Sequence, residues 1–70
     1  MREITASMAG TILNIFVSNG ENVKLGQEVL MLESMKMEIP IESPTEGIVR
    51  ECKVSIGDFV NEDDVLLVIE

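Results

Sequence analysis

The sequence predicts an all-β fold, a flattened β-barrel or sandwich of two small antiparallel sheets related by a pseudo-two-fold axis. Three observations lead to it. The two halves of the 70-residue chain repeat one another, short apolar runs alternate with closely spaced turn signals, and no stretch shows the capped periodicity of an amphipathic helix. We expect a single domain over residues 1–70, because this length is near the lower limit for folding without disulfides or metal.

The internal repeat appears when the sequence is shifted by 37 residues, or by 36 residues toward its end. The identical pairs are Ile4 and Ile41, Gly10 and Gly47, Val17 and Val54, Ser18 and Ser55, Gly20 and Gly57, Val23 and Val60, Val29 and Val65, and Leu30 and Leu66. Average composition would give about two such matches over roughly thirty aligned positions. Two copies are too few for a solenoid, so the repeat predicts one domain with internal two-fold symmetry, and Lys36 lies where the two copies join.

Each half contains a run that favours a strand. In the first half this run is Thr11–Val17, and its counterpart in the second half, Ile48–Val54, alternates apolar and polar residues more clearly. Val65–Ile69 is a continuous apolar run, typical of a buried strand and far too short to cross a bilayer. Met8 and Cys52 fit the apolar side of such strands, so we expect both in the core.

Glycine and proline mark the ends of these strands. Asn19-Gly20 is a strong turn signal, and Gly57-Asp58 stands at the equivalent place in the second half. Gly26 and Gly47 predict two further turns. Pro40 and Pro44 restrict their segment to an edge strand or a turn, since proline cannot donate a ladder hydrogen bond.

A lysine lies between two apolar runs near the middle of the chain. Val29–Leu32 precedes it and Ile39–Ile41 follows, which predicts a hairpin with Lys36 near its tip. The connecting residues 34–37 include no Gly, Asn, Asp or Pro, the residues that turn chemistry favours. We infer that function, rather than turn formation, selected the lysine and its flanking methionines.

Composition excludes several classes of function. A net charge of −8 disfavours nucleic acid and anionic membranes as partners, since both attract Lys and Arg. Without histidine and with one cysteine, the chain lacks the ligands of a metal site and shows no catalytic constellation, so we predict neither metal nor enzyme activity. The first residues have no hydrophobic signal core, and the lone cysteine cannot form an internal disulfide, so we expect a cytoplasmic protein. We also expect it to be a monomer.

The residues resemble a known family over nearly the whole length. Met35-Lys36-Met37 is similar to the attachment motif of the biotinyl domains of biotin-dependent carboxylases, part of the biotinyl/lipoyl attachment family. The segments 6–10, 22–27, 46–49 and 57–60 resemble the family's conserved turns and strands around that motif. The likeness is greatest to small free-standing attachment proteins, because the thumb insertion of some carboxyl carriers is missing between Val17 and Asn22.

This resemblance implies a role for each residue of the motif. A biotin protein ligase would join the carboxyl group of biotin to the Lys36 amine, and Met35 and Met37 would be recognition contacts beside it. The carrier would then serve a biotin carboxylase and a carboxyltransferase, shuttling a carboxyl group between them. Since the thumb restrains biotin where it is present, its absence implies a more mobile arm.

Two alternatives stay open. Glu33-Ser34 resembles the residues before the lysine in lipoyl domains, where biotinyl domains usually have alanine at the position of Ser34. Glu33 and Ser34 are therefore candidate determinants of ligase specificity, and a lipoyl carrier for a 2-oxoacid dehydrogenase-type complex, loaded by lipoyl-attaching enzymes, is the first alternative. An unmodified β-sandwich that only mediates assembly is the second.

Overall fold

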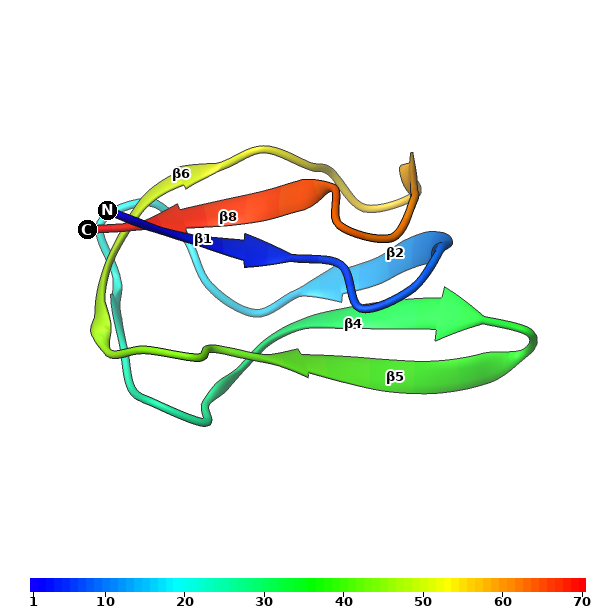
Figure 1. Cartoon of the computed structure of the whole chain (residues 1–70), viewed down its shortest axis with the longest axis horizontal. Helices are drawn as coiled ribbons and strands as arrows, with labels where there is room; N and C mark the ends of the chain where they lie inside the picture. The colour runs from blue at the N-terminus through cyan, green and yellow to red at the C-terminus, as the bar shows by residue number, and fades with distance from the viewer.

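Two four-stranded antiparallel sheets form the molecule, and the computed structural model describes all residues 1–70 (Figure 1). The strands are β1 (Arg2–Thr5), β2 (Gly10–Ile15), β3 (Asn22–Val23), β4 (Glu28–Ser34), β5 (Met37–Glu42), β6 (Gly47–Cys52), β7 (Phe59–Val60) and β8 (Val65–Ile69). One sheet has the order β1-β8-β6-β3 and the other β5-β4-β2-β7. The predicted all-β fold is confirmed, and the chain has no helix that could cross a membrane.

The sheet order confirms the pseudo-two-fold symmetry expected from the repeat. By the repeat, β1 corresponds to β5, β4 to β8, β2 to β6 and β3 to β7. Exchanging each strand for its counterpart turns the order β1-β8-β6-β3 into β5-β4-β2-β7. The turns match as well, since Gly20 and Gly57 have φ values of 90° and 94°. Side-chain hydrogen bonds repeat at the same spacing: the amide of Ser18 donates to Glu21, that of Ser55 to Asp58, that of Lys24 to Gln27, and that of Asn61 to Asp64.

The core lies between the two sheets and is built from both halves. The side chains of Val29, Leu30, Leu32, Leu66 and Leu67 have no exposed surface. They belong to β4 and β8, the symmetry-related strands that lie inside their sheets. Burying each such side chain contributes about 1.5–3 kcal/mol, so β4 is among the most firmly held strands of the molecule.

Three sequence-based expectations need correction. The strands predicted over Thr11–Val17 and Ile48–Val54 each begin one residue earlier and end two residues earlier, because the chain leaves the sheet toward the turns at Gly20 and Gly57. Met8 is 40% exposed rather than buried, whereas Cys52 packs against the core as expected. The bend over residues 7–9 lies outside the strand ladder, so the side chain of Met8 is not carried into the core.

Gly47 is the third correction, since it begins β6 instead of forming a turn. A Cβ atom there would lie 2.6 Å from the Glu70 carbonyl oxygen and 2.6 Å from Ile69 Cγ2. Close packing against the C-terminal strand therefore explains this glycine. Pro40, in contrast, lies in the edge strand β5, where the prediction placed it.

The β4–β5 hairpin projects from one end of the molecule, and the two chain termini lie together at the other end (Figure 1). The pairing of Arg2 in β1 with Ile69 in β8 holds the termini side by side. The longest dimension of the molecule is 30 Å, against 19 and 18 Å for the other two. The hairpin tip is thus as far from the chain ends as this fold allows.

Candidate functional site

Lys36 lies in a two-residue loop at the tip of the hairpin. Ser34, the last residue of β4, pairs with Met37, the first residue of β5, and only Met35 and Lys36 connect them. Both loop residues have positive φ, 53° for Met35 and 65° for Lys36. This combination is typical of the type I′ turn, which matches the twist of two-residue hairpins and normally requires Asn and Gly. The absence of turn-favouring residues noted in the sequence therefore has a conformational cost.

Replacing Lys36 with glycine should stabilise the protein relative to replacing it with alanine. The left-handed conformation costs an L-residue about 1–2 kcal/mol and costs glycine almost nothing, although glycine loses more entropy on folding. We expect Lys36→Gly to exceed Lys36→Ala in unfolding free energy by about 1 kcal/mol, which corresponds to a melting temperature higher by about 4–8 °C. Thermal melts of the two variants test this, and equal stability would show that the turn is unstrained.

The amine of Lys36 is free in solvent. Lys36 is exposed, and its neighbours Met35 and Met37 are 90% and 64% exposed. The protein has two salt bridges, Arg50 with Glu70 and Lys53 with Glu51, and neither includes Lys36. In a protein of net charge −8, an unpaired lysine at the tip of a projecting hairpin is accessible to an external enzyme from several directions.

Two carboxylates stand directly behind the tip. Glu33 of β4 is paired with Glu38 of β5, and both are exposed. Like charges directly opposite one another destabilise a strand pair, so this pair does not serve hairpin stability. Ser34, the residue next to Glu33, is half-buried and pairs with Met37. All five predicted site residues thus lie together at one end of the hairpin.

An open groove of about 650 Å³ runs beside Lys36. Met8, Gly10, Thr11, Met35, Lys36 and Phe59 are among the residues that line it. Phe59, which is 67% exposed, was not among the predicted site residues, and Met8 was expected in the core. The internal repeat could have indicated that Phe59 is exposed. Its equivalent in the first half is the polar residue Asn22, which suggests a position that faces solvent.

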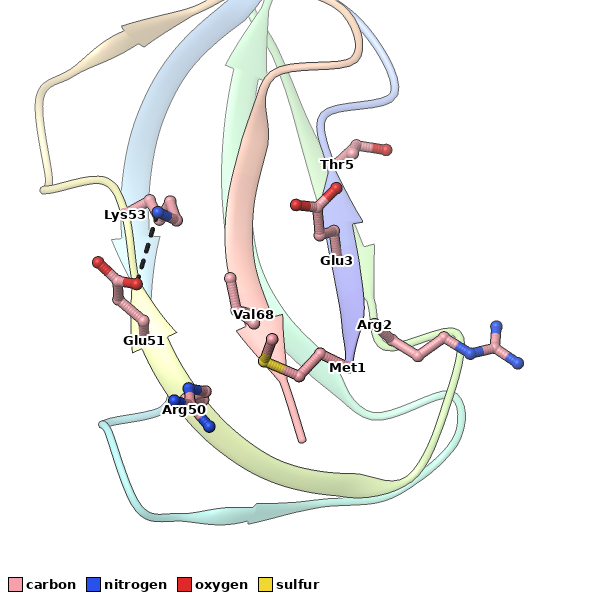
Figure 2. Close-up of a pocket in the computed structure, with 8 residues that line it drawn as sticks. All are labelled: Met1, Arg2, Glu3, Thr5, Arg50, Glu51, Lys53 and Val68. Atoms are coloured by element: carbon pink, nitrogen blue, oxygen red, sulfur yellow. Dashed lines mark ion pairs between the residues drawn. The ribbon is translucent and has the colours of Figure 1, made fainter.

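A second groove lies on the outer face of the other sheet and has a different character (Figure 2). Arg50, Glu51 and Lys53 lie on one side of Val68 of β8 and Glu3 on the other, and the side chain of Arg2 points away from them (Figure 2). Lys53 pairs with Glu51 at 3.4 Å, and both side chains are about half exposed. Solvated ion pairs of this kind contribute little energy, and we assign no chemistry to this groove.

Comparison with known proteins finds relatives over nearly the whole chain. A family model described as "Biotin-requiring enzyme" matches residues 2–69. A biotin/lipoyl attachment protein of Bacillus subtilis is 53% identical over 64 residues, which are 91% of this chain and 88% of that protein. Pyruvate carboxylase of Staphylococcus aureus is 40% identical over 67 residues, 96% of this chain but 6% of the carboxylase.

A solved structure supports the same assignment. The urea carboxylase of Kluyveromyces lactis superimposes with a TM-score of 0.92 at 25% identity, covering 99% of this chain and 6% of the carboxylase. The chain therefore corresponds to nearly the whole of one small attachment protein and to a small part of large carboxylases. Because the family model matches residues 2–69 and the Bacillus subtilis relative is 53% identical over most of both chains, this chain belongs to the biotin/lipoyl attachment domain family.

Proposed function

We propose that the chain is a biotin carrier in which Lys36 is the attachment site. The observation that carries the proposal is an unpaired lysine between two exposed methionines on a two-residue hairpin tip, within a family of biotin-requiring proteins. The named carboxylases among its relatives support carboxyl transfer as the purpose. The chain is a carrier rather than an enzyme, and its partners are a biotin protein ligase, a biotin carboxylase and a carboxyltransferase.

The residues at the tip fit covalent attachment of biotin. The Lys36 Nζ atom attacks the activated carboxyl carbon that the ligase presents, and a C–N amide bond forms. The activating group leaves, and the amine proton passes to a base of the ligase. No salt bridge has to be broken before this attack, since Lys36 forms none. When bound, biotin supplies a ring nitrogen that accepts and releases a carboxyl group.

The fold contributes rigid presentation of the lysine. Leu30 and Leu32, both without exposed surface, fix β4 in the core up to four residues before Lys36. The loop itself has only two residues, so Lys36 has little backbone freedom although its side chain is in water. A site held on a firmly packed strand pair reaches its partner enzymes in one orientation.

We propose further that residues 1–70 form one attachment domain, which acts as a cytoplasmic monomer. The family model over residues 2–69 and the continuous core support one domain. The edge strand β5 carries Pro40 between Glu38 and Glu42, features that discourage edge-to-edge strand pairing with a second copy. The single cysteine has no partner within the chain, which suits a reducing compartment.

The direct test is an intact-mass spectrum of the protein produced in cells with active biotin ligase and ample biotin, followed by peptide mapping. We expect one biotinyl group, located on Lys36. A protein that remains unmodified under these conditions would contradict the proposal and leave the assembly module as the better explanation.

Lipoate attachment is the second candidate function, because the Bacillus subtilis relative is described as a biotin/lipoyl attachment protein. Lipoyl-attaching enzymes would then act on the same lysine, and the same spectrum would show a lipoyl or octanoyl group. Glu33 and Ser34 already match the residues that precede the lysine in lipoyl domains. The choice between biotin and lipoate therefore depends on the flanking residues Met35 and Met37.

Changing both methionines should move the modification toward lipoate. We expect the double variant Met35→Asp with Met37→Ala to lose most biotinylation and to gain lipoylation when it is produced with a lipoyl-attaching enzyme. The same variant carrying Lys36→Arg is the control and should accept neither group. Unchanged biotinylation of the double variant would show that the flanking residues do not set specificity.

A further inference from the structure

Phe59 and Met8 form an exposed apolar wall beside Lys36. Strand pairing places Glu38, Glu33, Thr11 and Phe59 in one row across β5, β4, β2 and β7. Residues directly opposite one another point to the same face of the sheet. Since Glu33, Glu38 and Phe59 are exposed, this row lies on the outer surface. The groove beside Lys36 runs over this row, with the hairpin tip on one side and Phe59 on the other.

The exposure of Phe59 has no structural benefit. A phenylalanine that is 67% exposed forgoes most of the free energy that its burial would provide. Its neighbour Val60 in the same short strand is buried and anchors β7 to the core. In the first half of the chain the equivalent position holds Asn22, so the fold does not require an aromatic residue there. Exposed aromatic side chains in grooves are typical anchor points for protein partners.

The length of the lysine side chain limits how far from the hairpin tip an enzyme can act on its amine. From Cα to Nζ an extended lysine spans roughly 6 Å, five bonds of about 1.5 Å in a zigzag. An enzyme that acts on the bare Nζ atom must therefore approach the hairpin tip closely enough to cover the groove that Lys36 lines. Once the cofactor lengthens the tether, later enzymes reach its far end without such close contact.

We propose that the groove is the docking site of the biotin protein ligase, with Phe59 and Met8 as the apolar anchors. This inference rests on the proposed function and extends it to residues outside the attachment motif. The ligase seats an apolar side chain between Phe59 and the hairpin tip. Cationic groups of the ligase face Glu33 and Glu38. These two carboxylates repel each other in the free protein, and a positively charged partner turns that repulsion into attraction across the interface.

Steady-state kinetics of ligation test the proposal with the unmodified protein, biotin, ATP and a purified biotin protein ligase. Phe59→Ser and Met8→Ser should each raise KM for the carrier, by roughly tenfold for Phe59, with kcat within about twofold of the native value. Leu25→Ser is the matched control, since Leu25 is 71% exposed but lies in the turn before β4, at the far end from Lys36. Its KM should not change, and thermal melts verify that all three variants fold.

The outcomes separate this inference from the proposed function. If native protein is biotinylated on Lys36 and Phe59→Ser has the native KM, the docking site is wrong and the carrier function stands. If the native protein is not biotinylated at all, the carrier function itself fails.

A second assay tests whether the groove is specific to the ligase. Fully biotinylated Phe59→Ser should be carboxylated by a biotin carboxylase at the native rate. A tenfold loss in this reaction would show a surface shared by both enzymes and would overturn the assignment to the ligase.

Discussion

Lys36→Arg is expected to fold like the native protein and to accept no biotin. Arginine retains the positive charge and most of the length of lysine, but its guanidinium does not lose a proton in proteins and is not a nucleophile for acyl transfer. The substituted side chain lies in solvent and forms no salt bridge, so no packing is lost. The effect on modification should therefore be complete, while the melting temperature stays within about 2 °C.

Intact-mass measurement after incubation with ligase, biotin and ATP is the readout for this variant. Lys24→Arg and Lys53→Arg are matched controls, because they remove the other two lysines of the chain from exposed positions. Both should be biotinylated like the native protein. Biotin on the Lys36→Arg variant would mean that another amine is the acceptor, and the hairpin would lose its assigned role.

Gly10→Ala is expected to give the largest loss of stability, about 3 kcal/mol. Gly10 is buried in β2, and a Cβ atom there would overlap the carbonyl oxygen of Glu33 and lie 3.1 Å from Leu32 Cδ1. The obstructing carbonyl is backbone in β4, the strand that leads to Lys36, so relief requires the two strands to separate. Such a loss is a large part of the unfolding free energy of about 5–15 kcal/mol that small domains have.

Urea unfolding of Gly10→Ala and Gly20→Ala distinguishes two causes of lost stability, a clash with a neighbouring strand at Gly10 and backbone strain at Gly20. A Cβ at Gly20 would meet nothing within 4 Å, and its cost should be the strain of a φ of 90° alone, about 1 kcal/mol. The Gly10 variant should have a distinctly lower midpoint at a similar slope. If the two variants unfold together, the approach of β2 to β4 is looser than the structure indicates.

Much of the architecture could be predicted because the signals are local or periodic. Repeated residues such as Gly20 and Gly57 gave matching turns, and Pro40 indicated an edge position that β5 occupies. The expectation for Met8 was wrong, because an apolar residue in a short segment does not reveal whether the chain turns it inward. The bend before β2 leaves Met8 partly in solvent beside the hairpin.

The sequence by itself determined the two-fold arrangement of strands and the position of Lys36 at a hairpin tip, since both follow from spacing along the chain. The three-dimensional structure decided the left-handed backbone of Met35 and Lys36, because strand pairing on either side limits a two-residue loop to turns such as type I′ that match the strand twist. It also created the groove beside Lys36, where Met8, Thr11 and Phe59 meet. Phe59 is far from Met8 and Thr11 in the sequence, all three are far from Lys36, and only the pairing of β2 with β4 and β7 brings them to the lysine.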